Sequence, residues 1–264
     1  MDTDNARIIA ERDGAVGRLI ISNAKRRNAV TLEMWQAIPD ALRDLGAADG
    51  LRVIVVQGDG DAAFSAGADI SEFATKRSDA AAIATYDAAV DAACAALAEV
   101  PVPTIARIDG ICMGGGVALA LCCDLRLAAD DAQFAIPAAR LGLAYGMELL
   151  DQLVALVGPG HAKDIVFTGR RFDAAEARRL GLLNRVLAKS ALADAVADVA
   201  RSIAGNAPLS NRAHKTMIAE ALKTPRDRDL ERCRALVDAC YESADFAEGQ
   251  NAFREKRPPH FTGR

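Results

Sequence analysis

The chain has 264 residues, of which 51% are hydrophobic and 26% are charged, and its formal net charge is −4. A chain of this size can bury one sizeable core, or one core with a smaller helical appendage, and two full domains are not expected. Lys and Arg form no basic block, which argues against nucleic acid or an anionic membrane surface as the main partner.

The N-terminal sequence MDTDNARIIAERDG is polar and acidic, unlike a signal or transit peptide. No apolar run reaches the ~18–20 residues that a membrane span requires. We therefore expect a cytoplasmic protein with no membrane partner.

Cysteine and histidine spacings give no sign of a disulfide framework or a metal centre. The six cysteines form no Cys-x-x-Cys pair with a matching partner, and the three histidines lack a spacing that puts two ligands on one helix face. We expect reduced core thiols and no metal.

Strand and helix patterns alternate over the first half of the chain. Apolar residues at 7–11 and 17–21 flank Asp13-Gly14, which predicts a hairpin. Thr31 is placed to cap a helix whose apolar spacing runs through Leu32, Trp35, Ile38 and Leu42. A buried strand follows over 51–57, and an alanine-rich helix is predicted over 79–99 before Val100-Pro101.

Further strands are predicted at 104–108, 125–128 and 133–135. Alternation of this kind requires crossover connections and parallel pairing, so the fold class is α/β. From Met147 onward the pattern is helical, with breaks at Gly158-Pro159-Gly160, Gly169, Gly181, Pro208 and Pro225, and the last two helices are predicted at 208–221 and 228–253. We divide the chain into an α/β core, 1–200, and a C-terminal helical region, 201–264.

Two glycine-containing turns suggest a site for a developing negative charge. In Gly110–Asp124, three consecutive glycines lie between an apolar strand and a helix without charge, and the segment Phe64–Asp69 follows another predicted strand. Glycines let a ligand approach the main chain, and a helix start presents free N–H groups. One N–H from each turn would form an oxyanion hole.

The two motifs in this order resemble the crotonase superfamily, that of enoyl-CoA hydratase and isomerase. The resemblance covers nearly the whole chain, from Asn28-Ala29 through 66–70, 109–124, 169–174 and 177–186 to the tail at 248–257. It implies a core of stacked ββα turns with C-terminal helices that trimerise, in a homotrimer or a dimer of trimers. It also implies an acyl-CoA substrate, with coenzyme A as part of that substrate and no separate cofactor.

The resemblance assigns roles to individual residues. The N–H groups of Ala68 and Gly115 would hold the thioester oxygen, next to Gly114, and the loop Ala66–Ile70, which includes Asp69, would receive the adenine. Lys25, Arg26 and Lys256 would face the CoA phosphates, a role that suits lysine as a point charge. A solvated surface charge is the alternative for each of these cations.

The chain departs from its family at the residues that move protons. Hydratases of this type use two glutamates, and this chain has Ala118 and Ala138 at those places. The aspartate of dienoyl isomerases falls on Gly146. Because general acid–base catalysis typically contributes ~10²–10⁴-fold, ordinary hydration of crotonyl-CoA is expected to be crippled.

Tyr145 and Glu148 are the candidates to replace the glutamates. Tyr145 matches by position a tyrosine of malonyl-type acyl-CoA decarboxylases in this superfamily, and Glu148 falls where hydratases have glycine. A half-buried aromatic and an exposed carboxylate at a helix start are the respective alternatives. Asp69 and Asp124 lie at helix boundaries, where capping or a salt bridge is the expected duty.

Three functions remain open from the sequence. The first is an acyl-CoA enzyme that stabilises a thioester enolate, which includes a weak hydratase relying on Tyr145 or Glu148. The second is a decarboxylase of malonyl-type thioesters, whose substrate carries its own carboxylate and would be repelled by two glutamates. The third is a non-catalytic acyl-CoA-binding homologue.

Overall fold

The computed structural model describes residues 6–47 and 49–264. Its strands form a six-stranded sheet in the order β1-β2-β3-β5-β7-β10 and a four-stranded sheet in the order β4-β6-β8-β9. Pairing is parallel except between β1 and β2 and between β8 and β9. The predicted α/β class with parallel pairing is therefore confirmed.

The six-stranded sheet follows the sequence patterns closely. Its strands are β1 (Arg7–Asp13), β2 (Val16–Ser22), β3 (Val53–Gly58), β5 (Thr104–Ile108), β7 (Leu125–Ala129) and β10 (Arg185–Leu187). The predicted hairpin forms between β1 and β2, and Gly14 takes a positive φ of 57° in its turn.

The four-stranded sheet consists of short strands, and two of them were not predicted. They are β4 (Ala63–Ser65), β6 (Ile111–Met113), β8 (Gln133–Ala135) and β9 (Phe172–Asp173). β8 has the predicted bounds and β6 lies where a strand was expected before the three glycines, whereas β4 and β9 were not expected. A two- or three-residue strand is too short to show periodicity, so its existence depends on pairing with its neighbours.

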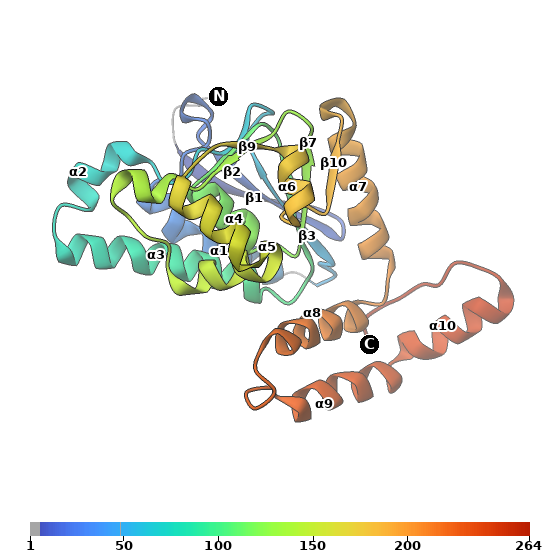
Figure 1. Cartoon of the computed structure of the whole chain (residues 1–264). Helices are drawn as coiled ribbons and strands as arrows, with labels where there is room; N and C mark the ends of the chain where they lie inside the picture. Colours follow the sequence, from blue (N-terminus) through green and yellow to red (C-terminus); the bar gives the residue numbers. More distant parts are fainter. Residues whose placement is uncertain (1–5, 48) are drawn as a thin grey trace.

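Helices cover both faces of the larger sheet (Figure 1). The main core lies on the face carrying α1 (Leu32–Ala47), α3 (Ala80–Glu99), α4 (Gly115–Leu121), α5 (Met147–Thr168) and α6 (Ala174–Leu180). A smaller cluster packs α7 (Lys189–Gly205) on the opposite face through Leu192, Val196 and Ala200. Short connections contain η1 (Ala24–Arg26), η2 (Ile70–Glu72), α2 (Phe73–Lys76) and η3 (Pro137–Leu141).

Side chains cap the starts of two helices. The Met34 N–H donates to Thr31 Oγ1 at 3.2 Å, as predicted, and the Ala82 N–H donates to Asp79 Oδ1 at 2.9 Å, a cap that was not predicted. Gly158 has φ 75° and interrupts α5 at the predicted break. By length and composition α3 could cross a membrane, yet one of its faces packs against α1 with Tyr86 and Leu97 fully buried.

The C-terminal helices are α8 (Pro208–Leu222), α9 (Leu230–Tyr241) and α10 (Ala244–Glu255), and they extend away from the sheets (Figure 1). The single helix predicted over 228–253 is wrong, because the chain breaks after α9. Ser243 caps the new helix by accepting from the Phe246 N–H at 3.1 Å. The division of the chain at residue 200 stays a prediction.

Candidate functional site

The two glycine-containing turns meet in the folded chain. A Cβ placed on Gly67 would lie 2.9 Å from the Gly115 nitrogen, and a Cβ placed on Gly115 would lie 3.2 Å from the Ala68 nitrogen. The glycines therefore allow the close approach of the two main chains. The fold thus brings together the backbone nitrogens of Ala68 and Gly115, as predicted, although the two residues are 47 positions apart in the sequence.

The turn containing Ala68 is held by main-chain contacts and one serine. Ser65 Oγ donates to the Asn28 carbonyl at 2.7 Å and accepts from the Gly67 N–H at 3.1 Å. The Gly67 carbonyl accepts from the Val30 N–H at 2.8 Å. Within the described residues the Ala68 N–H has no hydrogen-bond acceptor.

The turn containing Gly115 is held at the preceding residue. Gly114, at φ 48° and ψ −115°, donates its N–H to the Ala135 carbonyl at 2.8 Å. Its own carbonyl accepts from the Ala118 N–H at 3.1 Å and from the Tyr145 hydroxyl. Gly115 begins α4, where an N–H has no partner within the helix, and none is found elsewhere among residues 6–47 and 49–264.

Trp35 lies beside the second donor. Its side chain is fully buried, and its Cζ2 atom would be 2.9 Å from a Cβ placed on Gly115. The indole thus forms a wall at the paired turns, a role that the sequence did not predict. The helical spacing of α1 indicated burial of Trp35 without indicating what it would contact.

Tyr145 and Glu148 differ in how they relate to the turns. Tyr145 is half-buried between η3 and α5, and burial raises the pKa of its hydroxyl well above the usual value, so the hydroxyl stays protonated. Glu148 is exposed in the first turn of α5, with Oε2 3.4 Å from where a Cβ on Gly146 would lie. The pKa of Asp91 on α3 is raised, first by the burial of Asp91 itself and second by the negative charge of Glu148.

Residues 11–264 match the enoyl-CoA hydratase/isomerase family. The chain belongs to this family. It is 34% identical over 257 residues to a probable enoyl-CoA hydratase of Mycobacterium tuberculosis, covering 97% of this chain and 98% of the relative. A crotonyl-CoA hydratase of Syntrophomonas wolfei is 32% identical, with 96% and 97% covered.

Solved structures show the same crotonase fold. An enoyl-CoA hydratase/isomerase family protein from Hyphomonas neptunium superposes with a TM-score of 0.93 at 37% identity. The match covers 97% of this chain and 98% of that protein. The crotonase resemblance drawn from the motifs is thereby confirmed for family and fold.

Alanines occupy the two positions where we expected glutamates from the enoyl-CoA hydratase/isomerase resemblance. Ala118 lies one turn into α4 and is 1% exposed, and Ala138 lies half-buried in η3 against the main core. Both are therefore in contact with apolar groups, and neither can transfer a proton.

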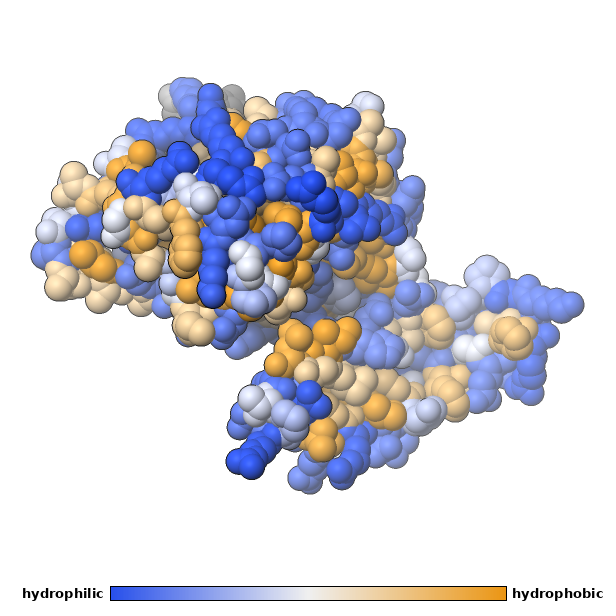
Figure 2. Space-filling view, viewed as in Figure 1, coloured by the Kyte–Doolittle hydropathy of each residue, from blue (hydrophilic) through white to orange (hydrophobic). Residues whose placement is uncertain are grey.

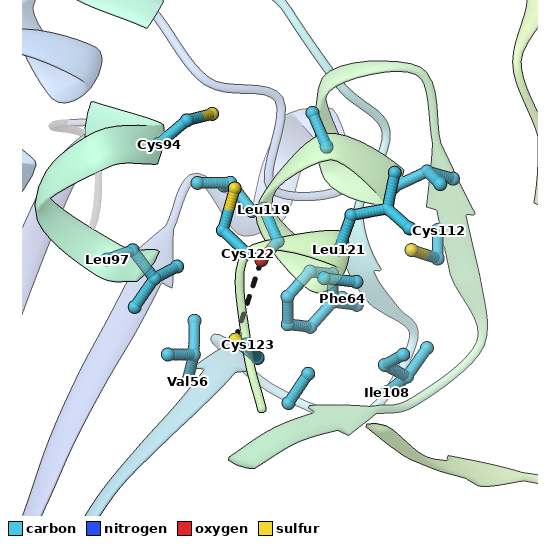
Figure 3. Packing of buried hydrophobic residues seen from close by; sticks show 14 of the residues in the cluster. Val56, Phe64, Cys94, Leu97, Ile108, Cys112, Leu119, Leu121, Cys122 and Cys123 are labelled. Carbon is cyan, nitrogen blue, oxygen red and sulfur yellow. Dashed lines mark hydrogen bonds between the residues drawn. The ribbon is translucent and has the colours of Figure 1, made fainter. Parts of the chain in front are cut away.

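Four thiols surround α4 in this member of the family (Figure 3). Cys122 and Cys123 follow the helix, Cys94 lies on α3, Cys112 lies on β6, and all four are free and buried. Burial raises the pKa of the Cys112 thiol and raises that of Cys123 to about 12, so neither is a thiolate nucleophile near neutral pH. These four cysteines lie in the core as predicted, and their reduced state stays a prediction.

The residues assigned to CoA are only partly brought together. Arg26 Nη1 lies 2.7 Å from Asp69 Oδ2, and the half-buried Ala66 donates its N–H to the Arg27 carbonyl at 2.9 Å. Ile70, which follows Asp69, is 63% exposed. Lys25 is exposed on η1, near Arg26. Lys256 follows α10, which Figure 1 places on the far side of the molecule from α2.

The carboxylates at helix boundaries have structural contacts. Asp69 Oδ1 accepts from the Ser71 N–H at 3.0 Å, and Asp124 Oδ2 accepts from the Thr104 N–H at 2.7 Å and from Lys215 Nζ at 2.9 Å. Their expected capping and salt-bridge roles are confirmed. No group of three or more His, Cys, Asp or Glu in the described part of the chain could hold a metal ion.

Proposed function

We propose that this protein processes acyl-CoA thioesters by holding the thioester oxygen with the N–H groups of Ala68 and Gly115. The observation that carries the proposal is the adjacency of these two N–H groups, each without an acceptor in the described chain. Main-chain donors fixed by the fold need no reorganisation as charge develops on the oxygen. Each such donor typically contributes about 2.7–4 kcal/mol to transition-state stabilisation.

The reaction follows from what surrounds the oxyanion hole. The two main-chain N–H groups can still stabilise the enolate. Because Ala118 and Ala138 replace the two glutamates of hydratases, no such pair of carboxylates activates water. Hydration therefore depends on Tyr145 or on Glu148, and we expect it to be slow.

Decarboxylation of a malonyl-type thioester is the second candidate. The buried Ala118 and the protonated Tyr145 hydroxyl favour it, because neither adds negative charge beside a substrate carboxylate. Loss of CO₂ leaves the electron pair of the broken C–C bond as the thioester enolate, which the two N–H groups would stabilise. In this case Tyr145 is the candidate proton donor.

Calorimetry with acetyl-CoA tests the binding site directly. We expect saturable binding by the wild-type protein and a large loss of affinity in Ala68→Pro, which removes an N–H that has no partner in the fold. Gly115→Pro is less informative, because its added atoms would also displace Trp35. Absence of binding of any acyl-CoA by folded wild-type protein would contradict the proposal.

Turnover of crotonyl-CoA, malonyl-CoA and methylmalonyl-CoA separates the possible functions. Consumption of crotonyl-CoA indicates a hydratase, and release of CO₂ from either malonyl-type thioester indicates a decarboxylase. Binding without consumption of any of the three indicates a non-catalytic acyl-CoA-binding protein.

Several finer properties remain proposals. We propose that CoA enters only as part of the substrate, that the protein is cytoplasmic, and that it assembles as a trimer or a dimer of trimers. Figure 1 places α10, which Lys256 follows, at the opposite end of the molecule from α2, so we propose that Lys256 reaches the CoA phosphates of a neighbouring copy.

A further inference from the structure

Each of the two candidate donors belongs to a peptide group whose carbonyl is itself hydrogen-bonded. The Ala68 N–H shares its peptide with the Gly67 carbonyl, which accepts from the Val30 N–H at 2.8 Å. The Gly115 N–H shares its peptide with the Gly114 carbonyl, which accepts from the Ala118 N–H and from the Tyr145 hydroxyl. A hydrogen bond to a carbonyl polarises its peptide and strengthens the N–H on the other side as a donor.

We propose that Tyr145 is a positioning residue that fixes and polarises the Gly114–Gly115 peptide through its hydroxyl, so that the Gly115 N–H faces the thioester oxygen. This inference rests on the proposed function. It differs from the role of proton carrier, because here the hydroxyl acts through a peptide and transfers no proton.

The conformation of Gly114 explains why such a group is needed. At φ 48° and ψ −115°, the residue occupies a region of backbone conformation open to glycine, and Gly115 beside it also lacks a Cβ. A peptide between two glycines has low steric barriers to rotation, so its orientation depends on hydrogen bonds. The Gly114 N–H donates to the Ala135 carbonyl, and the Gly114 carbonyl accepts from the Ala118 N–H and from the Tyr145 hydroxyl. The bond from Tyr145 is the one among these three that a side chain makes.

The surroundings of Tyr145 suit a fixed donor. Its ring packs against the main core, and its neighbours in the connection, Leu143 and Gly146, are exposed. The raised pKa of the hydroxyl keeps its proton in place over the working pH range. The hydroxyl is thus available as a donor to the Gly114 carbonyl whatever the state of the substrate.

Infrared difference spectroscopy of bound acetyl-CoA labelled with ¹³C at the thioester carbonyl tests this proposal. In the wild-type protein we expect the carbonyl band to shift to lower frequency on binding, as a polarised C=O bond does. In Tyr145→Phe, which keeps the ring, we expect a clearly smaller shift. For whichever of crotonyl-CoA, malonyl-CoA and methylmalonyl-CoA the wild-type protein consumes, kcat should fall about tenfold in Tyr145→Phe, with a smaller change in KM. Complete loss of an oxyanion donor would lower kcat by more than this, about 10²–10³-fold.

Tyr241→Phe is the matched control, because Tyr241 lies exposed on α9 and the substitution removes the same hydroxyl. It should leave the band and the turnover unchanged. A thermal melt of each variant checks that both remain folded.

The outcomes distinguish the positioning role from its rivals. An equal band shift in wild type and Tyr145→Phe would overturn the inference and leave the proposed function standing. If turnover were then abolished, Tyr145 would be a proton carrier, and if only stability or KM changed, its hydroxyl would merely anchor the connection to α5. Failure of the wild-type protein to bind acetyl-CoA would overturn both proposals.

Discussion

At the scale of single residues, the candidate site consists mainly of main-chain groups, and side chains matter by what they exclude. Positions 67, 115 and 116 have no room for a side chain larger than that of glycine. A Cβ on Gly116, for example, would lie 2.5 Å from the Ser65 carbonyl oxygen. The pairing of the turns could be predicted from the sequence, because glycines directly before a helix start allow two main chains to approach closely. The contact of Trp35 with Gly115 and the hydrogen bond from Tyr145 to Gly114 could not be predicted, because residue spacing does not indicate which group a buried side chain will contact.

The alanines at 118 and 138 lead to a prediction about hydration. We expect wild-type protein to hydrate crotonyl-CoA orders of magnitude more slowly than a hydratase with two glutamates, because two terms of ~10²–10⁴ are missing together. Ala118→Glu with Ala138→Glu should raise the rate, and either change alone should do little, since residues that act as a unit are non-additive. Absorbance of the enoyl thioester measures these rates.

The same variants should differ in stability. Position 118 is buried, so a glutamate there should have a raised pKa and should lower the melting temperature. Ala139→Glu, at the exposed neighbour of Ala138, is the control and should change neither rate nor melting temperature. Hydration by wild-type protein at ordinary hydratase rates would show that another group, Glu148 first, activates water.

At the scale of elements, prediction succeeded where burial and periodicity agree. β5 and β8 have the predicted bounds, and α8 differs from prediction by one residue at its end. The prediction failed for α9 and α10, because the break at Ser243 contains neither glycine nor proline and the apolar spacing continues through it. A serine cap competes with helix continuation only when the tertiary contacts favour the turn.

The tail after α10 is held by a carboxylate whose titration gives a pH dependence. Glu248 accepts from Arg257 Nη1 at 2.6 Å, from Arg257 Nη2 at 2.9 Å and from the His260 N–H at 2.7 Å. The arginine, followed by the His260 N–H, lowers the pKa of Glu248 from 4.5 to about 2. This contact is therefore fully present above about pH 4.5 and is lost as the pH falls through about 2.

Hydrogen exchange of the tail amides checks this contact. At neutral pH, Glu248→Ala should lower the protection of the His260 amide, whereas Glu231→Ala, an exposed carboxylate on α9, should not. In the wild-type protein the same protection should fall between pH 4.5 and 2. Equal protection of His260 in wild type and Glu248→Ala would show that the other contacts of the tail are sufficient, among them those of Asp245 with the Thr262 and Gly263 N–H groups and that of Arg52 with the Phe261 carbonyl.

At the scale of the whole molecule, the C-terminal helices carry more apolar surface than one chain covers. Figure 2 shows hydrophobic side chains gathered over α8 and α9, where Ile218, Leu222 and Tyr241 are exposed. A cavity of about 630 Å³ lies among α8, α9 and α10, lined by Met217, Phe246 and Phe253 among others. Contiguous apolar surface of this kind marks an interface, and closed symmetric assembly is the usual way to cover it.

We therefore expect light scattering at micromolar concentration to give the mass of a trimer or of a dimer of trimers. Phe253, which is 86% exposed on α10, should contribute to the contact, so Phe253→Glu should shift the mass towards that of a single chain. Phe167→Glu is the matched control, because Phe167 is 73% exposed but lies on α5, outside the C-terminal helices. A monomeric wild-type protein would show that α8–α10 fold back on their own core. Dissociation by Phe167→Glu alone would instead place the interface on the α/β core, and the exposed face of α8–α10 would then need another partner.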